Sequence, residues 1–217
     1  MLGNLFAYIV FKWTRMRLIT EMPPGSDRCV IICAPHTSNV DFFIALAFFI
    51  KLRIPIRYTI KREWVDKPII GAILRKTGAL PIDRRPKTPG AARPKMTEVM
   101  ANLFSEHQRM ALLVTPEGTR NKVTQWKSGF YYTALQAQVP IALAFADYRT
   151  RTCGVTSMVH PTGNMEQDMR EIMAFYQYKV GKFPEQFDLD HRYATEAQLA
   201  VVERMRTAPA TLVVEGD

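Results

Sequence analysis

Short apolar runs alternate with segments of helical character along most of the chain, and this alternation limits the possible folds more than any other feature. Runs with the length of buried strands occupy residues 28–34, 56–60, 79–82, 110–115, 139–146 and 153–159. Segments with the composition of helices occupy residues 39–51, 66–78, 95–107, 129–138, 164–180 and 194–206. Strands separated by helices predict an α/β fold, with a mostly parallel or mixed central sheet flanked by helices.

The chain has the size and composition of one globular domain. Its 217 residues can bury a substantial core, and 47% of them are hydrophobic. The cysteines Cys29, Cys33 and Cys153 form no metal-ligand pattern and cannot all pair with one another. We therefore expect a reduced, intracellular protein with a single domain over residues 27–217 and with no metal or cofactor.

Residues 2–16 predict an amphipathic helix that precedes this domain. One face carries Leu2, Leu5, Phe6, Ile9, Trp13 and Met16, and the other carries Asn4, Tyr8, Lys12 and Arg15. Such a helix either packs on the domain core or lies in a membrane interface. No apolar run reaches the roughly 18–20 residues that span a bilayer. We treat residues 1–22 as a separate amphipathic segment, which the Pro-Pro-Gly-Ser sequence at 23–26 ends.

The positive charge of the chain is concentrated in one block. The formal net charge is +9, and residues 51–95 hold thirteen basic and three acidic residues. A field of this sign favours an anionic partner. Nucleic acid, an anionic membrane surface and a phosphorylated small molecule all meet this condition.

A histidine and an aspartate follow the first strand-like run. His36 lies in the expected strand-to-helix loop, where open α/β sheets bind ligands, and Asp41 lies five residues later. A carboxylate that accepts Nδ1–H would leave Nε2 of the histidine as a base. Ser38 and Asp41 also have the spacing of a capping box, in which the acid only bonds a backbone N–H at the helix start. The spacing alone leaves both interpretations open.

Two further strand ends carry arginine. In the sequence TPEGTRN at residues 115–121, Gly118 permits close approach of the backbone, Thr119 offers a hydroxyl, and Arg120 offers a planar fork suited to phosphate. Another short strand ends just before Arg84. Either arginine alone is typical of a solvated surface. Together with a loop histidine they predict an anion-binding site beside a base.

These motifs resemble the four ordered blocks of the glycerolipid acyltransferases typified by 1-acylglycerol-3-phosphate acyltransferase. The blocks are the H-x4-D pair His36 and Asp41, GALPIDR at 78–84, PEGTR at 116–120 and VPI at 139–141. The resemblance covers residues 28–146 and extends to order and spacing. It implies transfer of an acyl group from a thioester, acyl-CoA or acyl-carrier protein, to a glycerolipid hydroxyl.

The resemblance also implies roles for individual residues. His36 would be the general base and Asp41 its orienting partner. The acceptor phosphate would be held by Arg84, Glu117, Gly118, Thr119 and Arg120. Thr115 and Pro81 depart from the residues usual in the family, and the fourth block lacks the family's second proline. Residues 160–217 carry no family motif, and we assign them no chemistry.

The expected function is therefore O-acyl transfer in phospholipid biosynthesis, with 1-acylglycerol-3-phosphate as acceptor and phosphatidate as product. Another lysolipid acceptor remains open. The expected partners are the acyl thioester, a lysophospholipid and an anionic membrane surface, and nucleic acid is disfavoured. Because these lipids reside in membranes, residues 1–22 should associate with a membrane, and the protein should be peripheral or monotopic on the cytoplasmic face. The alternatives are a thioesterase that uses water and a non-enzymatic basic protein that binds membrane or nucleic acid.

Overall fold

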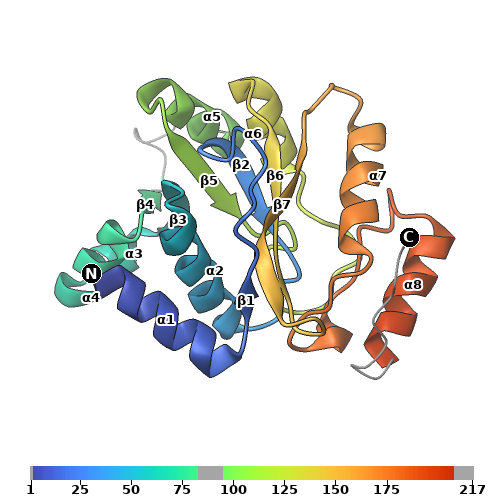
Figure 1. Ribbon diagram of the computed structural model, residues 1–217. Coiled ribbons are helices and arrows are strands. Elements are labelled where there is room, and N and C mark those ends of the chain that lie inside the picture. The colour runs from blue at the N-terminus through green and yellow to red at the C-terminus, as the bar shows by residue number, and fades with distance from the viewer. Residues whose placement is uncertain (1, 83–94, 208–217) are drawn as a thin grey trace.

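A computed structural model describes residues 2–82 and 95–207 as one α/β domain (Figure 1). The strands in this part of the chain are β1 (Arg17–Leu18), β2 (Arg28–Cys33), β3 (Ile56–Lys61), β4 (Ala79–Ile82), β5 (Met110–Val114), β6 (Ile141–Asp147) and β7 (Thr152–Val159). They form one sheet in the order β1-β7-β6-β2-β5-β3-β4. Strands β2 to β6 are mutually parallel, whereas β7 runs antiparallel to β6. The predicted mixed sheet is confirmed.

Helices cover both faces of the sheet. One face carries α1 (Leu2–Thr14), α2 (Asn39–Leu52), α3 (Arg62–Val65) and α4 (Pro68–Lys76). The other carries α5 (Met96–Glu106), α6 (Gly129–Ala137), α7 (Met165–Tyr176) and α8 (Glu196–Thr207), and a short 3-10 helix, η1 (Pro184–Gln186), precedes α8. Figure 1 shows α1, α3 and α4 grouped at one end of the sheet and α7 and α8 at the other.

Strand β2 lies at the centre of the sheet and contributes to the cores on both faces. Val30 and Ile32 pack with the α5–α8 layer, while Ile31 and Cys33 pack with the α1–α4 layer. A strand that is buried on both faces requires a continuous apolar sequence, and residues 28–34 supply it. The carboxyl ends of β2 to β6 share one edge of the sheet, which we call the carboxyl-end edge. The loop with His36 follows β2 at this edge.

The N-terminal segment differs from the prediction in two respects. The helix ends at Thr14, because Arg15 adopts a left-handed conformation with φ 57°, and β1 then joins the sheet beside β7. A two-residue strand has no periodicity that a sequence can reveal. In addition, α1 packs against α2 through Ala7 and Val10, so the predicted apolar stripe is left largely exposed.

Tyr176 connects α7 to two central strands. Its hydroxyl is fully buried and donates to the carbonyl oxygens of Ile32 and Ala144, each at 3.0 Å. We expect Tyr176→Phe to lower the free energy of unfolding by about 1–3 kcal/mol, because the donor is lost from a buried site. Urea denaturation of the natural protein and the variant would measure this change in the free energy of unfolding.

The matched control is Tyr178→Phe, since Tyr178 lies two residues away and is 48% exposed. This change should alter the free energy of unfolding by less than about 0.5 kcal/mol. Equal effects of the two substitutions would mean that the Tyr176 hydroxyl does not stabilise the junction.

Candidate active site

The predicted pair meets at the carboxyl-end edge of the sheet. His36 Nδ1 lies 3.5 Å from Asp41 Oδ2, and the side chains are 22% and 2% exposed, respectively. The loop after β2 carries the histidine, and the first turn of α2 carries the aspartate. Because Nδ1 faces Asp41, Nε2 lies on the far edge of the ring.

The capping box is present together with this pair. Asp41 Oδ2 accepts hydrogen bonds from the backbone N–H groups of Thr37 and Ser38, at 2.8 and 2.7 Å. Ser38 Oγ accepts from Val40 N–H at 3.0 Å. The two interpretations left open by the spacing are therefore compatible. The cap fixes the carboxylate, and the fixed carboxylate faces the histidine.

Tyr148 adds a contact that the sequence did not predict. It follows β6 at the carboxyl-end edge, and its hydroxyl donates to Asp41 Oδ1 at 2.7 Å. Burial, and then the charge of Asp41, raise the pKa of Tyr148 far above its ordinary value, so the phenol remains a donor at neutral pH. In the sequence, this contact has only a weak indication, which is an aromatic residue directly after a parallel strand that ends at the same edge as His36.

Glu117 lies in the interior beneath the His36 loop. Its Oε1 accepts a hydrogen bond from His36 backbone N–H at 3.0 Å, and the residue is 5% exposed. Burial is the main cause that raises the pKa of Glu117 to about 8. The carboxyl group is thus mostly neutral at pH 7. Its position suits a support for the histidine loop better than the substrate-binding role expected from the resemblance.

The rest of the PEGTR loop reaches the amino end of α2. Arg120 is exposed and donates to the side-chain oxygen of Asn39, the first residue of that helix. Gly118 has φ 67°, and a Cβ there would lie 2.6 Å from Lys127 Nζ, so glycine lets the lysine cross the loop. Thr119 is half-buried beside them. Two cations, Arg120 and Lys127, therefore lie close to this loop, and the sequence had indicated only the arginine.

Arg84, the second predicted phosphate ligand, lies outside the described residues. The strand before it, β4, is the outermost in the order β2-β5-β3-β4. At a strand spacing of about 4.8 Å, its carboxyl end lies roughly 14 Å from that of β2 on the same edge.

Residues 183–190, to which the sequence analysis assigns no chemistry, contact both the His36 loop and the PEGTR loop. Phe183 N–H donates to Thr37 Oγ1 at 3.2 Å. The Gln186 amide lies 2.9 and 3.1 Å from the carbonyl oxygens of Arg120 and Thr37, and it can donate to both when its nitrogen faces them. Asp190 accepts from the Trp126 backbone at 3.0 Å. No motif reveals such backbone contacts.

The described residues include no group of three or more His, Cys, Asp or Glu side chains placed to hold a metal ion.

Glu117 should make stability depend on pH. Below its ordinary pKa of 4.5 both folded and unfolded chains hold the proton. As pH rises from 4.5 to about 8, folding requires proton uptake, and the free energy of unfolding falls. Glu117→Gln does not titrate, so its stability relative to the natural protein should increase over this interval by on the order of a few kcal/mol.

Urea denaturation between pH 5 and 8.5 measures this difference. The control is Glu185→Gln, because Glu185 is exposed in the neighbouring segment, and its relative stability should not change with pH. A pH-independent difference for Glu117→Gln would show that Glu117 is ionised throughout.

Comparison with known proteins identifies the family and supports the fold. A family model described as Acyltransferase matches residues 16–142, which is more than half of the chain. Among solved structures, the 1-acyl-sn-glycerophosphate (LPA) acyltransferase PlsC from Thermotoga maritima is similar in fold, with a TM-score of 0.50 and 17% identity, covering 79% of this chain and 73% of that one. No curated protein sequence matches the chain. On the family match, the chain belongs to the acyltransferase family.

Proposed function

We propose that the protein transfers a fatty acyl group from an acyl thioester to the hydroxyl of a lysoglycerophospholipid, with 1-acylglycerol-3-phosphate as acceptor and phosphatidate as product. The observation that carries this proposal is the His36–Asp41 contact, placed beside Arg120 at the amino end of α2. A base next to a fixed cation is what acylation of a phosphorylated alcohol requires. The similarity to an LPA acyltransferase concerns the fold and agrees with this choice of acceptor.

The reaction follows from the orientation of His36. Asp41 holds Nδ1–H, so Nε2 accepts the proton of the acceptor hydroxyl. The hydroxyl oxygen attacks the thioester carbonyl and forms a tetrahedral oxyanion. Collapse of this intermediate breaks the carbon–sulfur bond and forms the ester. The departing thiolate takes the proton from His36 and restores the neutral base.

Direct transfer is favoured over a covalent acyl-cysteine. Cys33 precedes His36 by three residues, and it is buried at the end of β2. Burial, with the charges of Asp41 and Glu117, raises the pKa of its thiol far above the ordinary value. A thiol in this state is a poor nucleophile. The acceptor's own hydroxyl is therefore the attacking group.

The acceptor phosphate has a suitable position at the amino end of α2. The helix dipole favours negative charge there, and Arg120 is within hydrogen-bonding reach of Asn39 in the first turn. Lys127 lies across Gly118 in the same loop and adds a second positive charge. We assign phosphate binding to Arg120 with help from Lys127 and Thr119, and keep Arg84 as a candidate from the sequence.

The α1 helix gives this site a route to membrane lipid. Its exposed stripe includes Leu5, Ile9 and Trp13, with exposed fractions of 56%, 56% and 66%. The carbonyl at its carboxyl end, Thr14, accepts from Arg151, which places that end near the carboxyl-end edge. Within the described residues, no helix has both the length and the apolar character needed to cross a bilayer. We propose a peripheral or monotopic protein on the cytoplasmic face, with α1 in the interface.

Product analysis tests the function. Purified protein would be offered acyl-CoA and acyl-carrier protein with a panel of lysolipids, and the products would be identified by mass spectrometry. We expect phosphatidate from 1-acylglycerol-3-phosphate at the highest rate. Free fatty acid as the sole product would assign a thioesterase, and absence of any acyl product from every combination would contradict the proposal.

Substitutions at the pair should separate chemistry from folding. His36→Ala should lower kcat by on the order of 10²–10⁴, because the base is lost. Asp41→Asn should lower kcat through loss of the fixed tautomer.

Tyr148→Phe removes one hydrogen bond to a charged group and should lower kcat by about tenfold, with KM unchanged.

Steady-state kinetics and thermal denaturation of the same samples would check these expectations. If Tyr148→Phe lowers the melting temperature but leaves kcat intact, Tyr148 is structural and does not position the pair.

Arg120 should act on acceptor binding. We expect Arg120→Ala to raise KM for the phosphorylated acceptor tenfold or more, because a hydrogen bond to a charged group contributes about 1.5–3 kcal/mol. Arg120→Lys should restore only part of the loss, since a point charge cannot bind two oxygens as a fork.

The matched control is Arg170→Ala, because Arg170 is exposed on α7 and pairs only with Glu166 among the contacts described. Kinetics with a phosphorylated and an unphosphorylated acceptor would complete the test. Equal KM increases for both acceptors would remove Arg120 as a phosphate ligand.

A further inference from the structure

The helical hairpin α3–α4 exposes large apolar side chains to solvent. Trp64, Ile69, Ile70 and Ile73 are 46%, 78%, 41% and 59% exposed, and they lie within ten consecutive residues. Dense exposure of this kind marks a surface that binds a partner or a membrane. The family resemblance and the proposed chemistry assign no role to these residues.

Contacts between the two helices and with the core hold the hairpin in this arrangement. A Cβ at Gly71 would lie 1.9 Å from the carbonyl oxygen of Val65, which shows that the two helices touch through their backbones. Arg75 donates to the same carbonyl at 2.8 Å. Leu74 packs on the core of the α1–α4 layer. The isoleucines on the outer side therefore cannot turn inward without breaking these contacts.

Positive charge surrounds the apolar residues. Lys67, Arg75 and Lys76 lie on the hairpin, and Lys67 Nζ stands 4.2 Å from the centre of the Trp64 ring. Two acidic residues, Glu63 and Asp66, leave the hairpin net positive. Tryptophan and isoleucine flanked by lysine and arginine are typical of segments that lie among anionic headgroups.

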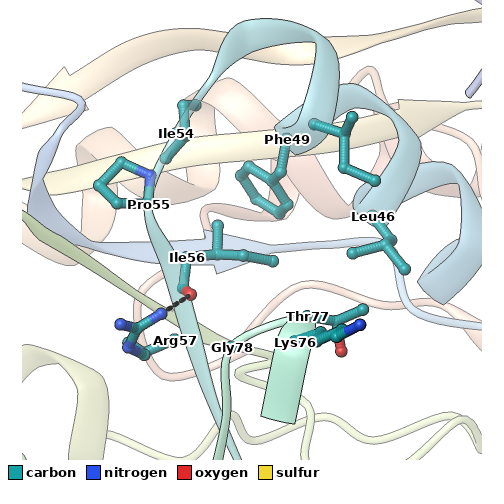
Figure 2. A pocket seen from close by; sticks show the side chains of 10 residues that line it. Leu46, Phe49, Ile54, Pro55, Ile56, Arg57, Lys76, Thr77 and Gly78 are labelled. Atoms are coloured by element: carbon teal, nitrogen blue, oxygen red, sulfur yellow. Dashed lines mark hydrogen bonds between the residues drawn. The ribbon is translucent and has the colours of Figure 1, made fainter. Parts of the chain in front are cut away.

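A shallow apolar groove lies between α2, the start of β3 and the carboxyl end of α4. Figure 2 shows Leu46, Phe49, Ile54 and Ile56 lining the groove, with Arg57 and Lys76 at its rim. Its volume is about 200 Å³. Ile50, also in the lining, is adjacent to Gly3, because a Cβ at this glycine would lie 3.2 Å from the isoleucine.

This groove is distinct from the candidate active site. It lies where β3 and β4 begin, at the amino ends of the strands, whereas His36 lies at the carboxyl-end edge. Figure 1 shows α1, α3 and α4 grouped at the same end of the sheet.

We propose that α3–α4 is a second membrane-contacting element, which lies together with α1 in the interface of an anionic bilayer. The apolar side chains enter the boundary between headgroups and acyl chains, and the lysine and arginine side chains bind the headgroups. Contact through both α1 and α3–α4 fixes the orientation of the domain relative to the membrane. A single helix lying in the interface does not. The inference concerns membrane binding and does not depend on the proposed acyl transfer.

Tryptophan quenching tests this contact directly. The chain has three tryptophans, of which Trp13 and Trp64 are exposed and Trp126 is buried in the core. In the Trp13→Phe variant, Trp64 is the one exposed tryptophan that remains, so quenching of its fluorescence reports contact of the hairpin with the vesicle. Vesicles of phosphatidylglycerol and phosphatidylcholine with brominated acyl chains should quench its fluorescence. The variant that lacks both Trp13 and Trp64 gives the background from Trp126.

Sedimentation with vesicles gives an independent measurement. The pair of changes Ile69→Ser and Ile73→Ser should weaken binding about tenfold or more, because apolar area no longer leaves water. The control pair Tyr132→Ser and Leu135→Ser removes two exposed apolar side chains of α6, on the opposite face of the sheet, and should leave binding unchanged. Lys76→Gln should weaken binding by about fivefold on anionic vesicles and not on neutral ones.

Some outcomes would overturn the proposal. Quenching of Trp13 without quenching of Trp64 would mean that α1 alone meets the bilayer. Unchanged sedimentation of the Ile69 and Ile73 variant would assign the hairpin to a protein partner instead. Because vesicle binding is measured without substrate, neither result depends on whether the protein transfers acyl groups.

Discussion

The Asp41 carboxylate is the group on which the geometry of the site depends. A buried carboxylate needs several donors, and Asp41 takes them from the backbones of Thr37 and Ser38 and from the Tyr148 hydroxyl. These donors come from the loop after β2 and from the end of β6. They converge because β2 and β6 are adjacent parallel strands whose carboxyl ends meet. The contact with His36 is local to this loop, whereas the Tyr148 donor depends on the order of strands in the sheet.

A second layer of contacts holds the loop that carries His36. Glu117 bonds the His36 backbone from below, and Gln186 joins the Thr37 and Arg120 carbonyls from the side. The His36 loop, the PEGTR loop and the C-terminal segment therefore form one connected unit. Neutral Glu117 performs this task without adding a second buried negative charge beside Asp41.

Local sequence predicted the features that depend on neighbouring residues. Apolar runs such as residues 28–34 identified the strands, and the five-residue spacing of His36 and Asp41 identified the pair. Tyr148 and Gln186 could not be found in this way, because each meets its partner only after the strands are ordered. The end of α1 at Thr14 depends on a left-handed Arg15 and on pairing with β7, which composition does not record. The sequence also did not reveal the exposed apolar surface of α3–α4. Apolar residues at helical spacing usually belong to the core, and only the fold shows that these residues lie outside it.

The contacts that residues 183–190 make with the site also determine when the site can form during synthesis. As the chain leaves the ribosome, β2 and the His36 loop emerge early, but β6 and Tyr148 follow more than a hundred residues later. The contacts on Thr37 and Arg120 come later still, from residues 183 and 186. Domains generally fold as units once their sequence is available. The supported His36 loop therefore forms only after residues 183–190 have been made, and a shorter growing chain presents His36 without these contacts.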